Sequence, residues 1–290
     1  MKLIKPSFEI WEQESGLEGV YKQIERAGRV CYKSEDKIAE GTAKAFVDRM
    51  IASGHGAMLE HGTVYLEIPD YGVSRLKFEK YMRNPYSTSI SSDVDSSYIT
   101  TNLRVLVENG WLNDLEYQCE PTEYHEKRIT VKFVCDRGVS HEFVRHRVFS
   151  FAQESTRYCN YSKAKFGKEL NCIIPCWYKN MFEGNSYNIE LCHTYDLTIS
   201  EGLSRTEAAW IQAMCEAEST YFGLLTEGEP AQQARNVLPL ALKTELIMTG
   251  TIEQWKGFFK LRDAGSAHPQ AYELAHPLHE EFIKRGYVAV

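Results

Sequence analysis

The sequence lacks both a membrane-spanning stretch and a secretory leader. No apolar run approaches the roughly 20 residues that a helix needs to cross a bilayer. The first residues, Met1–Pro6, contain two lysines and a proline and lack the apolar core of a signal peptide. These absences predict a cytoplasmic protein that does not interact with membranes.

An excess of positive charge is also absent. The 33 lysines and arginines are outnumbered by 40 aspartates and glutamates, so the formal net charge is −7. A long nucleic-acid-binding surface needs a broad positive face. We therefore predict no interaction with DNA, and we expect any anion site to be a local basic cluster.

Metal-binding and disulfide patterns are missing as well. The eight cysteines are scattered, and without a secretory leader they are expected to be reduced thiols. Cys172 and Cys176 are four residues apart and His276 and His279 three apart, but no second pair stands at zinc spacing. We predict no bound metal ion.

The chain has the length and composition of a globular protein with a large core. Of its 290 residues, 43% are hydrophobic and 25% charged. We predict a single α+β domain over residues 1–290, with a mixed β-sheet flanked by helices and a helical C-terminal half. Expected strands cover 64–68, 98–107 and 131–135. Expected helices cover 19–30, 38–51, 139–147, 189–225 (one helix, or two broken near Gly202), 230–235, 243–248, 252–261 and 270–285, with short helical pieces at 111–115 and 122–127; 71–82 is a helix or an irregular lid, 87–97 a loop and 163–185 irregular.

The most informative segment is Arg145–Tyr158, which contains three arginines, a histidine, a glutamine and two serines. Arginine is almost never fully buried unless it is paired, so core packing does not explain this run. Guanidinium groups bind phosphate bidentately, and hydroxyl and amide groups complete such a site. The alternative is a solvated basic loop. An expected strand before the run, a turn at 136–138 and a helix favour a rigidly presented anion site.

This segment resembles the signature of the flavin-dependent thymidylate synthases: Arg-His-Arg, two residues, Ser, four residues, Ser, one residue, Arg. Other segments are also similar to that family and occur in its order, from about Arg29 onward. They are Gly54-His55 with Glu60-His61, the run 234–240 and the run 258–262. All the fixed positions of the signature are polar, so generic core composition does not produce them; they are Arg145, His146, Arg147, Ser150, Ser155 and Arg157.

The resemblance implies roles for individual residues. Arg262 would activate the uracil ring as the catalytic residue, because a fixed guanidinium can stabilise charge on the N3/O4 side without a covalent bond. The deoxyuridylate (dUMP) would be held by Glu142, Arg145, Gln153, Glu154, Ser155, Thr156, Arg157, Arg235 and Arg262. The flavin would be lined by Cys31, His55, Glu60, Arg145, His146, Arg147, Val148, Gln153 and His268.

The same resemblance implies the reaction and the assembly. The family converts dUMP to dTMP with FAD as cofactor and with 5,10-methylenetetrahydrofolate and NADPH as co-substrates. The flavin carries the redox chemistry while the protein orients the reactants. A homo-oligomer is expected, most simply a tetramer with active sites shared between subunits.

Three features depart from the family pattern. Gln153 stands where some members have glutamate, and the loop before His268 is about two residues longer. In the segment 250–257, many members place an asparagine and an arginine against the flavin, whereas this chain has Thr251, Glu253 and Gly257. The resemblance therefore leaves open whether this segment contacts the flavin.

Other readings of the sequence remain open. A cysteine nucleophile for uracil chemistry would have to be Cys135 or Cys159, near the signature, but Cys135 ends an apolar strand where thiols are inert. A methylase or hydroxymethylase of another pyrimidine nucleotide would use the same signature. A nucleotide- or RNA-binding protein that has lost catalysis is the alternative from a different class.

Overall fold

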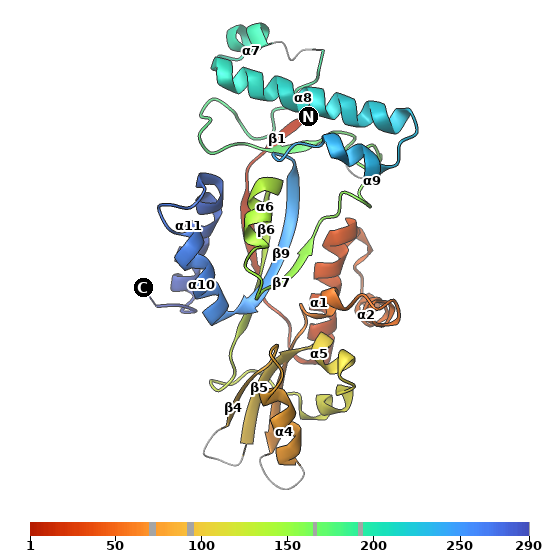
Figure 1. Ribbon diagram of the computed structural model, residues 1–290, viewed down its shortest axis with the longest axis vertical. Helices are drawn as coiled ribbons and strands as arrows, with labels where there is room; N and C mark the ends of the chain where they lie inside the picture. The colour runs from red at the N-terminus through yellow and green to blue at the C-terminus, as the bar shows by residue number, and fades with distance from the viewer. Residues whose placement is uncertain (70–73, 92–95, 165–166, 191–193, 290) are drawn as a thin grey trace.

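The computed structural model describes residues 1–69, 74–91, 96–164, 167–190 and 194–289 (Figure 1). Strands and helices both run through the chain, which confirms the α+β class. Parallel and antiparallel pairing are both present, but in separate sheets. The strands are β1 (Lys2–Ile4), β2 (Ser7–Trp11), β3 (Thr63–Pro69), β4 (Thr88–Ser91), β5 (Ser96–Asn102), β6 (Arg128–Asp136), β7 (Ser150–Gln153), β8 (Asn171–Ile173) and β9 (Lys243–Thr251).

The helices surround these strands, as expected. Where the chain is described, no helix is both long and apolar enough to cross a bilayer. The α-helices are α1 (Gly16–Tyr32), α2 (Thr42–Ala52), α3 (Gly56–Leu59), α4 (Ser74–Met82), α5 (Leu103–Glu108), α6 (Arg137–Phe143), α7 (Thr194–Ser200), α8 (Arg205–Thr226), α9 (Ala231–Ala234), α10 (Ile252–Arg262) and α11 (Pro269–Lys284), and the 3₁₀ helices are η1 (Glu35–Lys37), η2 (Leu112–Tyr117) and η4 (Arg235–Val237).

A four-stranded antiparallel sheet with the order β2-β6-β9-β7 forms the middle of the molecule. The expected helix over Lys243–Met248 is wrong, because this segment begins β9, which pairs with β6 on one side and β7 on the other. Both faces of β9 are covered, so its sequence has no alternation of apolar and polar residues to mark a strand. A C-terminal segment thus joins strands from the first half.

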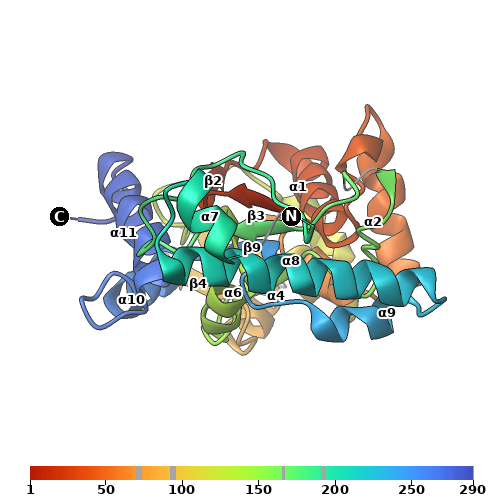
Figure 2. The same ribbon diagram turned by 90° about the horizontal axis from the view of Figure 1, so that it is seen from above.

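Helices cover both faces of this sheet. Met248 and Phe133 pack against Trp255 of α10 in one hydrophobic cluster, while Ile247 packs with Ile24 of α1 in another. Seen from above, α10 and α11 lie to one side of β9, α1 and α2 lie to the other, and α8 crosses over them (Figure 2). The side chains of β9 therefore alternate between two cores.

A second antiparallel sheet, β3-β5-β4, lies with α4 at the end of the molecule opposite α8 (Figure 1). Two expectations are wrong here. Thr88–Ser91 is a strand, not a loop, and the expected strand over 98–107 changes to helix α5 after Asn102, whose side-chain oxygen accepts a hydrogen bond from the Val105 N–H at 3.2 Å. Residues 71–73 of the expected helix or lid and 92–95 of the expected loop lie outside the described residues.

At the opposite end, α7 and α8 lie over the parallel pair β1-β8 (Figure 1). For residues 189–225 the sequence predicted one helix or two helices broken near Gly202, and the structure has two, α7 and α8. Residues 191–193 lie outside the described part. Ser204 and Glu207 start α8 with a reciprocal capping box. Two smaller expectations fail: the helix over 38–51 begins only at Thr42, and residues 122–127 contain turns and no helix.

Candidate active site

The arginine-rich signature begins where α6 ends. The carboxylate of Asp136, the last residue of β6, accepts a hydrogen bond from the Val139 N–H at 2.8 Å and so caps α6. The helix ends at Phe143 and not at Arg147 as expected, because tight turns follow, with the His146 N–H donating to the Phe143 carbonyl at 3.0 Å. Arg145 and Arg147 are consequently exposed to solvent.

Arg262, the last residue of α10, reaches across to the end of α6. Its NH1 donates to Oε2 of Glu142 at 2.5 Å, and its NH2 donates to the carbonyl oxygen of Glu142 at 2.8 Å. Its Nε donates to Nε2 of His146 at 3.0 Å. All three guanidinium nitrogens are therefore engaged by one turn of chain, and the structure brings the predicted catalytic arginine to the signature.

His146 is held as a neutral imidazole. A guanidinium can only donate, so Nε2 of His146 accepts and its proton lies on Nδ1. Burial, and next the positive charge of Arg262, lower the pKa of His146 to about 4. The ring also lies 5.0 Å from that of Phe258, centroid to centroid. His146 therefore orients Arg262 without adding a second positive charge.

Strand β7 carries the middle of the signature and is fixed from both sides. The Oγ of Ser150 accepts a hydrogen bond from NH2 of Arg128 at 3.1 Å. The Nε2 of Gln153 donates to Oγ of Ser140 on α6 at 2.9 Å and to Oγ1 of Thr244 on β9 at 3.2 Å. Gln153 is thus the last residue of β7, hydrogen-bonded to the helix whose end contacts Arg262 and two residues before Ser155.

Ser155 lies just beyond β7, where the chain enters a turn. Its backbone N–H donates to the carbonyl of Cys31 at 3.1 Å, and its Oγ accepts from the Arg157 N–H at 3.3 Å. Burial alternates from Phe151 to Thr156, so Ser155 is half-buried between two buried neighbours. The hydroxyl proton remains available for a ligand, and in the described structure no imidazole or carboxylate is hydrogen-bonded to this oxygen.

Arg157 and Arg235 flank this turn. NH1 of Arg235, at the junction of α9 and η4, donates to Oγ1 of Thr156 at 3.4 Å. Arg157 is exposed and lies over the ring of Tyr158 at 5.2 Å. The structure therefore gathers two guanidinium groups and two hydroxyl groups around one turn, as a phosphate site requires.

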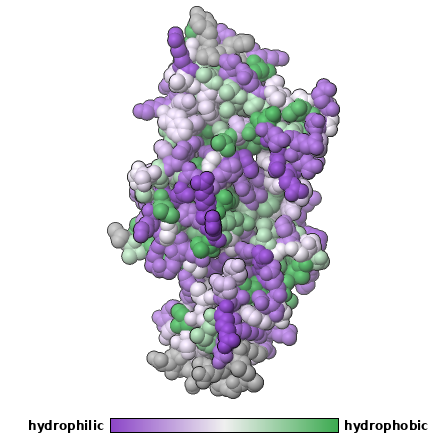
Figure 3. Space-filling model, in the orientation of Figure 1, coloured by the Kyte–Doolittle hydropathy of each residue, from purple (hydrophilic) through white to green (hydrophobic). Residues whose placement is uncertain are grey.

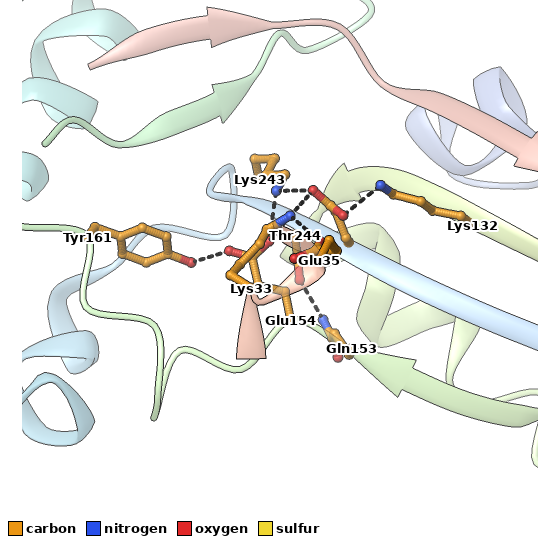
Figure 4. Close-up of polar contacts among 9 residues, drawn as sticks. Lys33, Glu35, Lys132, Gln153, Glu154, Tyr161, Lys243 and Thr244 are labelled. Carbon is orange, nitrogen blue, oxygen red and sulfur yellow. Dashed lines mark hydrogen bonds and ion pairs between the residues drawn. The ribbon is translucent and has the colours of Figure 1, made fainter. Parts of the chain in front are cut away.

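Glu154 faces away from these groups. It is 2% exposed, and its carboxylate accepts a hydrogen bond from the Tyr161 hydroxyl at 3.0 Å and pairs with Lys243 at 2.8 Å. The resemblance places Glu154 at the nucleotide. In the structure its backbone adjoins Ser155, while its side chain belongs to a buried charged network (Figure 4).

The other expected flavin residues lie beside β7. Cys31 of α1 is buried, and burial raises the pKa of its thiol to about 11. Its Sγ is 3.7 Å from Sδ of Met58 on α3. His55 precedes α3 and Glu60 follows it, where the Glu60 carboxylate accepts from Arg104 at 2.5 Å. Cys31 is thus joined directly to the Ser155 turn, and α3 lies against α1 and β7.

The structure explains one departure from the family pattern. Thr251 and Gln254 form a capping box that starts α10, with the Thr251 Oγ1 accepting from the Gln254 N–H at 3.3 Å. Glu253 is exposed and pairs with Lys256 at 2.5 Å. Open space surrounds Gly257. Thr251 and Glu253 therefore stabilise the first turn of α10, and this helix positions Arg262 at its other end.

His268 and Val148 lie at the margins of the site. His268 precedes α11, is exposed, and has its ring 6.0 Å from that of Trp177. Val148 is 65% exposed. No hydrogen bond joins His268 to the signature in the part of the chain that is described. The family resemblance placed His268 and Val148 at the flavin, and in the structure both side chains are accessible to a ligand.

Sequence reasoning missed the buried polar groups beneath the signature. Arg128, at the start of β6, donates to Ser150, to the carbonyl of Glu60 at 3.0 Å and to Oγ1 of Thr63 at 3.3 Å. Nearby, Nδ1 of His61 lies 2.8 Å from Oγ1 of Thr249. The sequence does contain a signal for these contacts, because an arginine at the start of a buried strand requires polar partners.

The remaining thiols and imidazoles lie in different surroundings, and Cys176 is exposed. Cys135 and Cys159 are both 0% exposed, and burial raises the pKa of the Cys135 thiol well above its usual value. Cys172 is also buried. His276 and His279 each contact the carboxylate of Asp263 through Nδ1, at 2.8 and 2.6 Å, and therefore tie α11 to the end of α10.

Several known proteins are similar to this chain over different parts of its length. A flavin-dependent thymidylate synthase of Corynebacterium aurimucosum is 23% identical over 267 residues, covering 91% of this chain and 76% of that protein. One of Pyrococcus furiosus is 30% identical over 151 residues, covering 52% of each chain. A crystal structure of a UMP/dUMP methylase, PolB from Streptomyces cacaoi, bound with 5-Br dUMP, has a TM-score of 0.43 and 17% identity, covering 98% of this chain and 93% of that one.

A family model described as thymidylate synthase complementing protein matches residues 120–285. The match covers more than half of the chain, and it includes the signature together with Arg235 and Arg262. The expected membership in an enzyme family, stated from the signature and the similar segments around it, is confirmed. This chain belongs to the family of thymidylate synthase complementing proteins, the flavin-dependent thymidylate synthases.

Proposed function

We propose that this protein catalyses the FAD-dependent reductive methylation of dUMP to dTMP, with 5,10-methylenetetrahydrofolate as one-carbon donor and NADPH as reductant. The observation that carries the proposal is the placement of Arg262 against Glu142 and His146, at one end of a signature whose other end gathers phosphate-binding groups. Family membership supports the same activity.

The dUMP phosphate binds at the Ser155–Arg157 turn. Arg157 and Arg235 supply charge, while Ser155 and Thr156 supply hydroxyl groups. Each hydrogen bond to the charged phosphate contributes on the order of 1.5–3 kcal/mol. Glu142, Arg145 and Gln153, which precede this turn in the chain, hold the rest of the nucleotide.

The residues expected along the flavin fit a cofactor with a pyrophosphate and a flat apolar ring. Arg145 and Arg147 are exposed guanidinium groups, which suit a pyrophosphate, and Val148 offers an exposed apolar side chain. His146, His55, Glu60, Cys31, Gln153 and His268 complete the proposed lining. FAD held by these residues would supply the hydride chemistry of the methylation, with NADPH as the source of reducing equivalents.

Arg262 activates the uracil ring. Its fixed guanidinium stabilises negative charge on the N3/O4 side of the ring, which raises the electron density at C5, the atom that is methylated. Glu142 and His146 hold the guanidinium in place before substrate binds. Arg262 stays charged at working pH, so it acts by its field and not as a proton donor.

A homotetramer with shared active sites, formed by one-domain chains in the cytoplasm, completes the proposal. Its support is the exposed apolar surface close to the signature: Val148 is 65% exposed, Leu240 63% and Leu261 60%. Figure 3 shows hydrophobic surface among hydrophilic residues at mid-height, on the face that carries α6 and β7. A second subunit would cover such surface.

One incubation tests the function. The purified protein, supplied with FAD, NADPH and 5,10-methylenetetrahydrofolate, is given dUMP, UMP or dCMP, and the product mass is measured. We expect dTMP from dUMP, and a yellow protein absorbing at about 450 nm. Methylation of UMP or dCMP in preference to dUMP would make it a variant methylase. Bound nucleotide without any product would make it a binding protein.

A further inference from the structure

A buried charged network lies directly behind the nucleotide turn. We call it the Glu154 network: Lys33, Lys132, Glu154, Lys243 and Glu245, with the hydroxyl of Tyr161 (Figure 4). The Nζ of Lys243 lies 2.8 Å from Oε2 of Glu154 and 2.6 Å from Oε1 of Glu245. Lys33 pairs with Glu245 and lies 3.9 Å from Glu154, and Lys132 lies 2.8 Å from Oε2 of Glu245.

The network joins four separate segments of the chain. Lys33 follows α1, Lys132 is on β6, Glu154 follows β7, and Lys243 and Glu245 are on β9. The backbone repeats the same connections, because the Glu154 N–H donates to the Glu245 carbonyl at 2.9 Å and the Ser155 N–H donates to the Cys31 carbonyl at 3.1 Å. The start of the nucleotide turn is therefore fixed to β9 and to α1 by side chain and main chain together.

Lys33 occupies a position whose backbone conformation is unfavourable for any residue other than glycine. It closes α1 in the left-handed conformation, with φ 48° and ψ 58°, and the Ser34 N–H donates to the Arg29 carbonyl at 3.0 Å. Glycine is the residue that normally fills this place, because other residues are strained there. The ion pairs of the Lys33 side chain with Glu245 and Glu35 offset this backbone cost.

Lys33 and Glu245 both shift toward the charged form, whereas burial and the Glu154 carboxylate raise the pKa of Tyr161 and keep its hydroxyl neutral. Burial alone would lower the pKa of Lys33, but the carboxylates of Glu154 and Glu245 raise it above its usual value. Burial alone would raise the pKa of Glu245, but Lys243 and Lys33 hold it well below its usual range. A cavity of about 410 Å³, lined in part by Lys33, Glu154, Tyr161 and Lys243, adjoins the network. Ionic contacts, more than close packing, hold these side chains in place.

We propose that Glu154 is a positioning residue for nucleotide binding: through the Glu154 network it holds the Ser155–Arg157 turn against α1 and β9. This inference rests on the proposed function, which places the nucleotide phosphate at that turn. Glu154 itself does not touch the nucleotide, because its carboxylate lies on the other face of the chain from Ser155. Losing the network charge lets the turn shift, and a displaced turn binds phosphate less well.

The test compares Glu154→Gln with the wild-type holoenzyme. Glutamine keeps the shape and accepts from Tyr161, but it removes one carboxylate from both lysines: Lys243 keeps Glu245, and Lys33 keeps Glu245 and Glu35. We expect the Kd for dUMP, measured by calorimetry, and the KM to rise about tenfold, as when one charge-assisted hydrogen bond is lost. The change in kcat should be much smaller, because the reacting atoms are untouched.

A second variant keeps the test decisive if Glu154→Gln does not fold. Lys33→Gly removes one cation of the network and relieves the left-handed backbone, so its thermal midpoint should be retained while the KM for dUMP rises. Lys44→Met is the matched control, because Lys44 pairs with Asp48 at 2.7 Å on the exposed face of α2. It should leave both dUMP and FAD binding at wild-type values.

The possible results separate this inference from the proposed function. Wild-type affinity for dUMP in both Glu154→Gln and Lys33→Gly overturns the inference, even if both variants unfold at lower temperature. An equal loss of dUMP and FAD affinity also overturns it, because that result indicates general loosening. If the wild-type protein binds no dUMP, the proposed function and the inference fall together. If it binds dUMP without making dTMP, only the function falls.

Discussion

Arg262 contacts Glu142 twice, once at the carboxylate, 2.5 Å from NH1, and once at the backbone carbonyl, 2.8 Å from NH2. With Nε bonded to His146, the plane of the guanidinium is fixed before any substrate arrives. Such a preorganised donor needs no reorientation when negative charge develops on a bound ring.

Replacing Arg262 should separate the two halves of the reaction. Arg262→Ala should lower the rate of methylation by about two to three orders of magnitude, the effect of losing one preorganised donor. Arg262→Lys should recover little, because lysine keeps the charge but loses the planar fork. Reduction of FAD by NADPH should survive in both. If flavin reduction fails while pre-reduced enzyme methylates normally, Arg262 belongs to the reductive step.

Ser155 should bind substrate without forming a covalent bond. In the described structure its oxygen is hydrogen-bonded to a backbone N–H and to no imidazole or carboxylate that would act as a base. Ser155→Ala should raise the Kd for dUMP about tenfold, as expected for one lost hydrogen bond to a charged group, and should still yield dTMP. Intact dUMP binding with complete loss of product would contradict this prediction.

The free energy of unfolding should depend on pH through His146. Its pKa in the folded protein is about 4, below the value of about 6.5 for an unfolded chain. Between these values the unfolded state binds more protons, so this contribution to stability is complete above pH 6.5 and is lost as the pH falls toward 4.

Proton NMR titration of the ring measures the His146 pKa directly. His146→Asn should make unfolding less sensitive to pH between about 6.5 and 4. Arg262→Ala should move the His146 titration to higher pH, because the positive charge of Arg262 adds to the effect of burial. A titration midpoint at the ordinary histidine value in the folded wild type would sink this prediction.

Mixed tetramers should report whether active sites are shared. If Arg157 and Arg262 of one site come from different chains, inactive Arg157→Ala and Arg262→Ala proteins, dissociated and reassembled together, should regain partial dTMP synthesis. The matched control mixes Arg262→Ala with a double variant lacking both arginines, which should stay inactive. A fully active monomer, seen by light scattering, would rule out sharing.

Two glycines should respond to alanine in opposite directions. A Cβ at Gly62 would lie 2.5 Å from Cδ1 of Ile24 and 2.7 Å from Cγ1 of Val20. Gly62→Ala should therefore lower the free energy of unfolding by about 1–3 kcal/mol. Gly257, in α10, has open space around it, so Gly257→Ala should raise it by up to about 1 kcal/mol. Denaturant titration measures both, and equal effects would contradict the packing argument.

The scaffold of the signature could be predicted from sequence because its signals are local. Val131–Cys135 has the composition of a strand, Asp136 is a good helix cap, and the structure shows β6 followed by α6. The family resemblance of the run 258–262 assigned Arg262 to the same site as the signature, and the structure brings Arg262 against Glu142 and His146. The end of α6 was misplaced because periodicity alone does not show where turns replace a helix.

The rest depended on tertiary contacts that no local pattern records. Lys243–Met248 resembles a helix until one knows that helices cover both faces of β9. Lys33 and Lys243 are ordinary surface residues in the sequence, and only the fold places them against Glu154. Glu154 is buried and its neighbour Ser155 is half-buried, and the different roles proposed for them follow from this difference.

The central position of β9 has a consequence for how the protein is made on the ribosome. β6 and β7 emerge first, but the strand between them is synthesised only after the whole stretch from Glu154 to Leu242. At roughly 5–20 residues per second this delay is on the order of ten seconds. Throughout that time two strands have unpaired edges, and Arg262 has not yet been made. The nascent chain therefore needs protection from aggregation until β9 has been made, and the candidate site is complete only once Arg262 has followed it.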